Sequence, residues 1–415
     1  MSKLEELIKQ LCPNGVKYKR LDEVFESFNG MTGVSNKWKE NGNCQFIEYM
    51  NAYKNLKINI KLLPFATVKK LQQNTLQKGD ILLTCASETP YECAVSSVIE
   101  DEIKDNVFLD DHLFGIRVKK DMKSEINTTF INYYMHTNNF RKKINKAVRG
   151  VTRFYISIDE FMKICIPVPP LEVQCEIVHI LDDFTLLSAE LSAELKAREK
   201  QYDYYTEKIW SYLENEKRVR LDTICEIGDG LHGTPEYENN TKLWFVNGNN
   251  LENGRIIINK STKEISNKSY NKYNGNYKIG TILMSINGTI GKIAYYTGEK
   301  IILGKSAAYF EVIEENTVCN KYLYYYLQSK KALQYFENNK TGSTIKNLGL
   351  KALREMKIPF PDRGKQEEIA GKLEKLDKLC NDISEGLPAE IEARQKQYEY
   401  YRDKLLTFKE LKVNE

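Results

Sequence analysis

Two glycine-containing segments have the residue types of nucleotide-binding loops, but their surroundings do not suit that chemistry. Gly228–Gly233 (GDGLHG) has the GxGxxG spacing that lets a backbone approach a pyrophosphate. A helix would have to open directly behind it to hold the phosphates, and Thr234-Pro235 with a polar run stands there instead. Gly304-Lys305-Ser306 matches the end of a P-loop, but Gly298 lies one residue too far upstream and the run between reads as a strand. Neither segment therefore predicts a nucleotide cofactor.

Asp110, Asp111 and His112 place three metal-ligating side chains in a row, although an Asp-rich turn is the commoner explanation. The 4 histidines lack ligand spacing, and the 9 cysteines include no CxxC pair. The chain also has no Asn/Asp-Pro-Pro-Tyr methyltransferase loop and no convincing carboxylate–lysine cluster of a nuclease. We expect no metal, no cofactor and no catalytic residue. An unrecognised DNA-modifying enzyme stays as an alternative.

The sequence offers no sign of secretion or of a membrane. The N-terminal residues MSKLEELIKQ lack the apolar core of a signal peptide, and no stretch approaches the roughly 20 apolar residues that cross a bilayer. An odd number of scattered cysteines is typical of reduced thiols. We expect a cytoplasmic protein with no membrane partner.

The net charge of +4 is unevenly distributed along the chain. Segments 172–213 and 365–410 carry −5 and −2, so the remaining residues must carry +11. A basic surplus on globular parts is typical of a protein that binds a polyanion, and a plain solvated basic surface explains it about equally well.

An internal repeat with a period near 195 residues organises the chain. AREKQYDYYTEKIW at 197–210 matches ARQKQYEYYRDKLL at 393–406, and IPVPPLEVQCEIV at 166–178 matches IPFPDRGKQEEIA at 358–370. Shorter matches pair Arg20–Asp22 with Arg220–Asp222, Gly79–Leu82 with Gly280–Leu283, Tyr133–Tyr134 with Tyr325–Tyr326, and Gly150–Ile166 with Gly342–Ile358.

Each repeat combines a globular part with a long helix. Short apolar runs at 80–85 and 281–286 predict strands, and segments near 130–146 and 321–337 have helical spacing. We therefore expect an α+β fold: two similar globular domains separated by two long antiparallel coiled-coil helices, related by a pseudo-twofold. The expected domains are 1–165 and 216–357, and the expected helical spacers are 166–215 and 358–415.

The two spacers show the alternating 4,3 spacing of a coiled-coil seam. The first seam runs over about five heptads, through Ile177, Leu181, Phe184, Ser188, Leu191, Leu195, Arg198, Tyr202, Tyr205, Ile209 and Tyr212. At about 1.5 Å per residue, such a helix spans roughly 60 Å. The second runs through Ile369, Leu373, Leu376, Cys380, Ile383, Leu387, Ile391, Arg394, Tyr398, Tyr401, Leu405 and Phe408. Its extra step of four coincides with Gly386 and Pro388, which predicts a kink or a short break.

The Ile-Pro-x-Pro boundary followed by a glutamine and a long helix occurs twice, and each helix ends in KQYDYYTEKI or KQYEYYRDKLL. In these features nearly the whole chain resembles the specificity subunits of type I restriction–modification systems. The resemblance implies two target-recognition domains that each read one part of a split double-stranded DNA sequence. It also implies helices that fix the non-specific spacer and dock two modification (methyltransferase) subunits, joined by restriction/translocase subunits.

The same resemblance assigns base readout to loops that mix glycine, cations and hydroxyls, because such side chains match base edges and phosphates. The expected DNA-binding residues are Ser87, Thr89, Arg149, Gly150, Thr152, Arg153 and Tyr155 in the first half, and Asn287, Thr289, Lys292, Gly342, Ser343, Thr344, Lys346 and Asn347 in the second. We also expect a phosphate-facing helix end at Arg141, Lys142 and Lys143. A plain solvated helix face explains this basic run equally well.

The expected partner-binding positions lie on the two long helices: Ile177, Leu181, Phe184, Leu191, Tyr202 and Tyr205 on the first, and Ile369, Leu373, Leu376, Tyr398 and Tyr401 on the second. A coiled-coil scaffold whose globular domains bind proteins stays as a second alternative. The salt dependence of the affinity distinguishes DNA binding from protein binding. Affinity for DNA phosphates falls steeply as the salt concentration rises, whereas affinity across an apolar protein interface does not.

Overall fold

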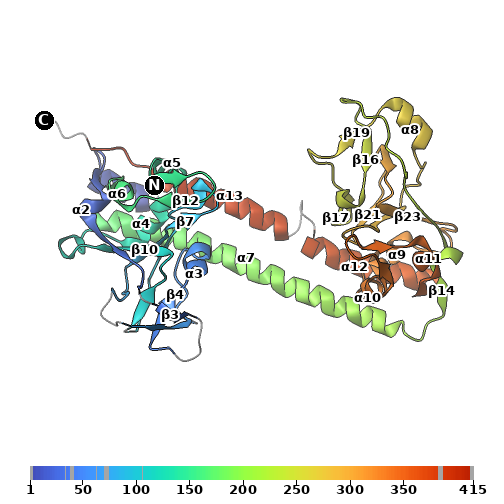
Figure 1. The fold of residues 1–415 in the computed structure, drawn as a ribbon, viewed down its shortest axis with the longest axis horizontal. Helices are drawn as coiled ribbons and strands as arrows, with labels where there is room; N and C mark the ends of the chain where they lie inside the picture. The colour runs from blue at the N-terminus through green and yellow to red at the C-terminus, as the bar shows by residue number, and fades with distance from the viewer. Residues whose placement is uncertain are drawn as a thin grey trace. The chain divides into compact units, whose positions relative to one another are not determined.

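The chain forms two compact units in a computed structural model that describes residues 3–32, 34–37, 42–61, 63–69, 74–104, 106–381 and 387–411. Residues 1–190 and 392–415 form the first unit, and residues 191–391 form the second (Figure 1). Two helices, α7 (Leu171–Tyr212) and α13 (Leu387–Leu405), pass from one unit into the other.

The described residues of the first unit form four sheets. The central one is antiparallel, in the order β2 (Phe25–Asn29), β10 (Leu113–Val118), β6 (Ile81–Thr84), β8 (Ser96–Val98). The second has the order β3 (Val34–Lys37), β5 (Phe65–Val68), β4 (Cys44–Ile47), β9 (Val107–Leu109), and its β4 and β9 are parallel. The others are the pair β1 (Lys17–Arg20) and β13 (Cys165–Val168), and the order β11 (Val148–Gly150), β12 (Phe154–Ile156), β7 (Ala86–Ser87). The helices are α1 (Lys3–Leu11), α2 (Leu21–Val24), α3 (Tyr49–Lys54), α4 (Thr128–Met135), α5 (Asn138–Ile144) and α6 (Ile158–Met162), with 3₁₀ turns η1 (Pro90–Glu92) and η2 (Lys120–Met122).

Strand β6 shows why the central sheet lies between two apolar layers. Its side chains alternate between the two faces of the sheet, as in any strand. Ile81 and Leu83 enter the core that contains Phe130 of α4, whereas Leu82 enters the core that contains Ile47 of β4. Helices α4, α5 and α6 therefore cover one face of this sheet, and the second sheet and α3 cover the other.

The second unit repeats this plan with a smaller second sheet. Its central sheet has the order β15 (Cys225–Asp229), β23 (Ala307–Val312), β20 (Ile282–Ser285), β21 (Ile293–Tyr295). Smaller sheets are β19 (Lys263–Glu264), β16 (Trp244–Val246), β22 (Ile301–Leu303); β14 (Arg218–Arg220) with β26 (Lys357–Pro359); β17 (Leu251–Glu252) with β18 (Arg255–Ile256); and β24 (Lys340–Thr341) with β25 (Asn347–Leu348). The helices are α8 (Asn267–Tyr273), α9 (Asn320–Leu327), α10 (Lys330–Asn339), α11 (Leu350–Glu355) and α12 (Arg363–Asn381), with 3₁₀ turns η3 (Leu221–Thr223) and η4 (Gly248–Asn250).

Strand order confirms the predicted repeat and the α+β class. The order β2-β10-β6-β8 of the first unit corresponds to β15-β23-β20-β21 of the second, and β1-β13 corresponds to β14-β26. The parallel pairs β4–β9 and β16–β22 also correspond. Strand β20 alternates like β6, with Ile282 and Met284 in one core and Leu283 in another.

The helical segments near 130–146 and 321–337 each consist of two short helices. The hydroxyl of Thr137 accepts from the N–H of Phe140 and opens α5, and that of Ser329 accepts from Ala332 and opens α10. Hydroxyl side chains at this position satisfy N–H groups that have no partner inside the helix. The equivalent break in both units is therefore encoded locally.

Helix α7 is continuous over its 42 residues, but its predicted seam is wrong near the C-terminal end. Ile177 and Leu181 are buried as predicted, whereas Tyr205 is 41% and Tyr212 is 73% exposed. Trp210 and Leu213 are buried in their place, in the core of the second unit. A straight helix drifts away from a strict 3.5-residue repeat, so the buried stripe moves around α7 along its length.

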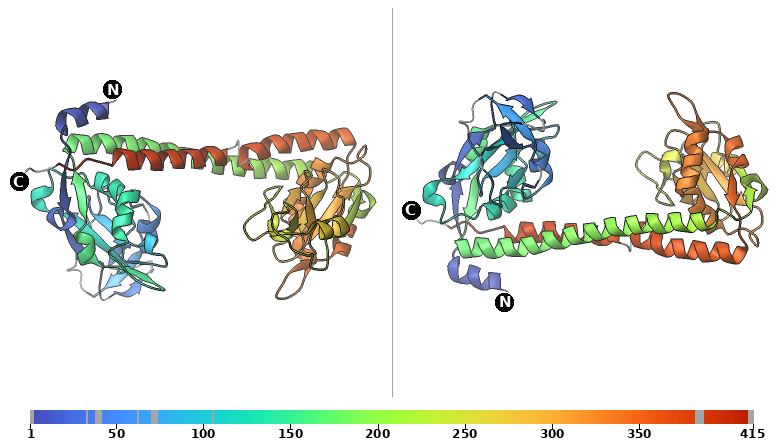
Figure 2. Two further views of the ribbon diagram at one scale, coloured as in Figure 1. Left: turned by 90° about the horizontal axis from the view of Figure 1, so that it is seen from above. Right: turned by 90° about the horizontal axis from the view of Figure 1, so that it is seen from below.

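The second long helical segment is recorded as two helices, α12 and α13. The predicted break at Gly386 lies in 382–386, outside the described residues. In the first unit α13 runs beside the beginning of α7 (Figure 2), where the rings of Phe184 and Tyr401 stack at 5.6 Å. Among the described residues, no helix is both long and apolar enough to cross a membrane.

Candidate nucleic-acid interface

The two loops predicted to read DNA in the first unit lie side by side. Strand β7 ends at Ser87, and Ser87 pairs with Phe154 of β12 in the antiparallel sheet β11-β12-β7. The hairpin between β11 and β12 carries Arg153, so one small sheet presents both loops. Ser87 and Arg153, which are 66 positions apart in the sequence, therefore share one surface.

The tip of the β11–β12 hairpin is strongly exposed and conformationally restricted. Gly150 has a φ of +120°, and a Cβ atom there would lie 2.0 Å from the carbonyl oxygen of Arg153. Only glycine fits such a turn without strain. The next residue, Val151, is 91% exposed, and Arg149, Thr152, Arg153 and Tyr155 are exposed as well.

A cleft of about 1310 Å³ opens beside this hairpin. Its lining joins Ser87, Thr152 and Arg153 of the predicted loops to residues from α3, η1 and the β9–β10 turn. The other lining residues are Glu48, Tyr49, Met50, Tyr53, Ala86, Glu88, Glu92, Asp110 and His112. The rings of Tyr49 and Tyr53 stack at 5.7 Å.

Glu92 links three hydroxyl groups at the edge of the cleft. Tyr53 Oη donates to its Oε1 at 2.7 Å, while Ser87 Oγ and Thr89 Oγ1 donate to its Oε2 at 3.0 and 2.8 Å. These hydrogen bonds hold the pKa of the Glu92 carboxyl below its ordinary value. The sequence predicts Ser87 and Thr89 as site residues but not Glu92 or Tyr53, because no spacing signal joins 53 to 92.

The basic end of α5 faces the protein more than expected. The Arg141 guanidinium donates to the carbonyl oxygens of Tyr91, Cys93 and Ala94 at 2.5, 2.6 and 2.9 Å. Burial lowers the pKa of this guanidinium to about 10.

Of the two neighbouring lysines, Lys143 also faces the protein, whereas Lys142 faces solvent. Lys143 Nζ donates to the carbonyl of Cys165 at 3.0 Å, and burial lowers the pKa of its ammonium group. Lys142 is exposed. A phosphate contact by Arg141 or Lys143 would require that residue to give up its present bonds, whereas Lys142 is already accessible.

The second unit also brings its two predicted loops together. Asn287 and Asn347 form an antiparallel bridge, and the N–H of Gly288 donates to the carbonyl of Lys346 at 2.9 Å. The hairpin tip repeats the first one, because Gly342 has a φ of +91° and its added Cβ would lie 2.2 Å from Ile345 O.

The side chains of this second surface combine hydroxyls, lysines and asparagine amides. Ser343, Thr344 and Lys346 are exposed on the hairpin, as is Thr289 on the neighbouring loop. Lys346 Nζ donates to Gly342 O at 2.9 Å, and Lys292 Nζ lies 3.7 Å from a carboxylate oxygen of Glu252. Asn287 Nδ2 donates to the carbonyl of Lys305 at 3.2 Å.

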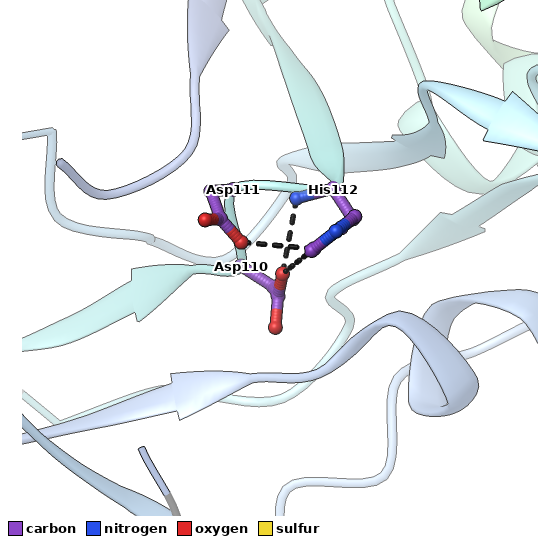
Figure 3. A group of neighbouring side chains, drawn as sticks. All are labelled: Asp110, Asp111 and His112. Atoms are coloured by element: carbon purple, nitrogen blue, oxygen red, sulfur yellow. Dashed lines mark hydrogen bonds and ion pairs between the residues drawn. The ribbon is translucent and has the colours of Figure 1, made fainter. Parts of the chain in front are cut away.

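Asp110, Asp111 and His112 form a tight turn at the rim of the first cleft (Figure 3). Asp110 Oδ1 accepts from the backbone N–H of His112 at 3.0 Å, which is the bond of an Asx turn. The His112 Nδ1 atom lies 3.0 Å from Asp110 Oδ1 and 2.9 Å from Asp111 Oδ1. Local hydrogen bonding therefore accounts for the geometry of this group.

The two nucleotide-loop lookalikes fall in places unsuited to phosphate binding. Gly228–Gly233 begins at the end of β15, and the next helix along this fully described stretch is α8 at Asn267. Gly304-Lys305-Ser306 is the turn between strands β22 and β23. Neither glycine segment leads into a helix N-terminus, as the sequence context predicted.

The predicted partner-binding positions divide by exposure. Ile177, Leu181, Ile369, Leu373 and Tyr398 are buried; Phe184, Leu191, Tyr202, Leu376 and Tyr401 are partly buried; and Tyr205 is exposed. Two exposed tyrosines that the seam analysis omitted occupy equivalent places in the repeat, Tyr204 on α7 and Tyr400 on α13. Lys208 lies over the Tyr204 ring and Lys404 over the Tyr400 ring, both at 5.8 Å.

Comparison with known families decides what these paired surfaces belong to. The model of the type I restriction modification DNA specificity domain matches the chain twice, over residues 13–198 and 214–393. The chain belongs to this family. The resemblance drawn from the boundary and tail motifs is therefore confirmed, and the family is one of DNA recognition rather than catalysis.

Curated relatives carry the same assignment. The type I restriction enzyme EcoR124I/EcoR124II specificity subunit of Escherichia coli is 36% identical over 270 residues, which cover 62% of this chain and 66% of that protein. A putative type I restriction enzyme specificity subunit of Haemophilus influenzae is 33% identical over 299 residues, which cover 69% of this chain and 74% of that protein.

Solved structures share the fold at low sequence identity. The S subunit of a type I restriction–modification system from M. genitalium has a TM-score of 0.55 and 16% identity, over 94% of this chain and 96% of that chain. A chain from a study of complex assembly and conformational transition of the type I R-M system has a TM-score of 0.60 and 15% identity, over 95% and 98%.

Proposed function

We propose that this specificity-family chain binds a bipartite double-stranded DNA site, with each unit reading one part of the sequence. The observation that carries the proposal is the recurrence of one surface in both units: a glycine-tipped hairpin joined by backbone pairing to a second loop. Ser87 with Phe154 forms this junction in the first unit, and Asn287 with Asn347 forms it in the second.

The side chains at these surfaces suit base and phosphate recognition. Arg153, Lys346 and Asn347 offer donors for guanine, phosphate and adenine, and the nearby hydroxyls of Thr152, Ser343 and Thr344 suit base edges or phosphates. In this proposal residues 1–165 and 216–357 are the two target-recognition domains.

We further propose that segments 166–215 and 358–415 set the non-specific spacer and dock two modification subunits, which restriction/translocase subunits join. The repeated Tyr204–Lys208 and Tyr400–Lys404 groups support this, because one surface present twice suits two copies of one partner. Exposed tyrosine is also enriched at protein interfaces. The cytoplasm, where bacterial DNA lies, is the proposed location.

The proposal is tested with the full chain and its cognate modification subunits. Fluorescence anisotropy measures the Kd for a labelled duplex that carries the methylated motif of the host, and for a duplex with the motif scrambled. We expect tighter binding to the motif, by about 10³-fold or more, and a log Kd that rises linearly with log salt. Equal affinity for the two duplexes would contradict sequence-specific recognition. An affinity that does not change with salt concentration would favour the alternative of a coiled-coil scaffold whose globular domains bind proteins.

A further inference from the structure

The cleft of the first unit has a charge that does not suit phosphate. Among the described residues, four carboxylates line it, those of Glu48, Glu88, Glu92 and Asp110, against one guanidinium, that of Arg153. A phosphodiester placed among these carboxylates would be repelled. Base edges carry no net charge, and the amino groups of adenine and cytosine are donors that oxygen acceptors attract. Within a DNA-binding unit, this cleft is therefore suited to base edges.

Glu92 determines the hydrogen-bonding character of three hydroxyls, those of Tyr53 and Ser87 in the cleft lining and that of Thr89 next to it in the chain. Each hydroxyl has one hydrogen and two lone pairs. The hydrogens of Tyr53, Ser87 and Thr89 all point to the Glu92 carboxylate, at 2.7, 3.0 and 2.8 Å. With its hydrogen committed in this way, each hydroxyl can offer a ligand only oxygen lone pairs.

The segment that carries Glu92 is itself firmly held. Thr84 Oγ1 donates to the carbonyl of Glu92 at 3.0 Å, and the Arg141 guanidinium bonds the carbonyls of Tyr91, Cys93 and Ala94 on either side. A carboxylate on such a fixed backbone keeps its position when a ligand enters. This gives Arg141 a role in supporting the cleft wall.

We propose that Glu92 is a positioning residue for base specificity, which keeps the hydroxyls of Tyr53, Ser87 and Thr89 as acceptors that read an exocyclic amino group, adenine N6 or cytosine N4. The proposal rests on the proposed function, since it requires the first unit to bind DNA. It adds the direction of the hydrogen bonds to that function. The hydroxyls of this cleft accept hydrogen bonds from bases, and the Arg153 guanidinium, which also lines the cleft, donates them.

The experiment uses the full chain with its modification subunits and a duplex that carries the methylated motif. Within the first half-site, each adenine is replaced in turn by purine and each cytosine by 2-pyrimidinone, which removes one amino group at a time. The wild-type complex should lose about tenfold in affinity at one or more of these positions, the size expected for a specific base contact. The same replacements in the second half-site show whether the Glu92 variant changes only its own unit.

Glu92→Gln tests the direction of these hydrogen bonds, because the hydroxyls no longer have to donate to a carboxylate and the amide adds N–H donors of its own. We expect this variant to discriminate less than about threefold at the position that the wild type reads, with the second half-site unchanged. Glu6→Gln is the matched control, because Glu6 is an exposed glutamate of α1 in the first unit and does not line the cleft. It should keep the wild-type pattern.

The outcomes separate this inference from the proposed function. If the wild type binds the motif but tolerates loss of every amino group in the first half-site, the inference is overturned and the proposed function stands. Full discrimination by a folded Glu92→Gln variant overturns it too. If Glu92→Gln does not fold, the wild-type scan alone decides. A wild type that does not distinguish the motif from scrambled DNA removes the proposed function, and this inference with it.

Discussion

Gln174 and Gln366 lie 192 residues apart and make the same three hydrogen bonds. The Oε1 of Gln174 accepts from the N–H of Asn127 at 2.8 Å, and that of Gln366 accepts from Cys319 at 2.9 Å. The amide nitrogens each donate to two carbonyl oxygens, those of Glu125 and Pro169 for Gln174, and those of Thr317 and Pro361 for Gln366. Both side chains are completely buried. Each globular part is thus fastened to the start of its own long helix by one amide.

Gln174→Ala should destabilise the first unit by about 2–4 kcal/mol, because it leaves a buried N–H and two buried carbonyls short of a partner. Gln201→Ala on the exposed face of α7 is the matched control and should change stability by less than about 0.5 kcal/mol. Denaturant unfolding followed by circular dichroism measures both. A Gln174→Ala protein as stable as the control would show that the fastening is dispensable.

Arg153→Ala should weaken binding to the motif by about 1–3 kcal/mol if the guanidinium contacts a base through two hydrogen bonds. Loss of a phosphate contact would instead weaken binding to all sequences equally. Arg198→Ala, on α7 and paired with Glu194, removes the same charge far along the chain from the cleft. Anisotropy titrations with motif and scrambled duplexes compare the two variants, and wild-type affinity for Arg153→Ala would exclude this residue from the interface.

Gly150→Ala should distort the first hairpin, since alanine at a φ of +120° is strained and its Cβ would meet the carbonyl of Arg153. A cost of about 1–3 kcal/mol is expected for such a backbone, felt mainly as weaker motif binding. Gly233→Ala provides the control, because no atom lies within 4 Å of the added Cβ. Equal affinities of the two variants would mean that the hairpin shape does not matter for recognition.

His136 should make the stability of the first unit sensitive to acid. Its ring is partly buried, its Nε2 lies 2.8 Å from the carbonyl of Ser96, and desolvation lowers its pKa from 6.5 to about 4. The unfolded chain therefore binds a proton between these values that the folded chain does not bind. The stability associated with the neutral ring is complete above pH 6.5 and is lost as the pH falls through 4.

Between pH 7 and pH 4, the wild type should lose on the order of 3 kcal/mol more unfolding free energy than His136→Gln does. Chemical denaturation at a series of pH values provides the comparison. Each protein serves as its own reference at pH 7, so a general loss of stability in the variant does not affect the result. Parallel pH profiles would contradict a neutral, partly buried ring.

The sequence predicted the repeat well because its signals are local. The strands at 80–85 and 281–286, the Ile-Pro-x-Pro boundaries and the glycine turns all depend on neighbours within a few residues.

The features that the sequence did not predict depend on contacts between distant residues. Arg141 stands in a basic run that suggests solvent, and only folding places the carbonyls of Tyr91, Cys93 and Ala94 around it. A strict 3.5-residue period places Tyr205 in the seam, whereas the folded chain buries Trp210 beside Tyr322. Glu92 belongs to no motif, and its meaning comes from hydroxyls as far away as Tyr53.

The exchange of one recognition domain tests most directly whether each unit reads a different part of the DNA site. Residues 15–165 are replaced by the equivalent segment of another specificity subunit, and methylated motifs are then mapped across the genome of cells that carry either chain. We predict that one half of the bipartite motif changes while the other half keeps its sequence. An unchanged motif, or one altered in both halves, would contradict the claim that each unit reads its own part of the DNA.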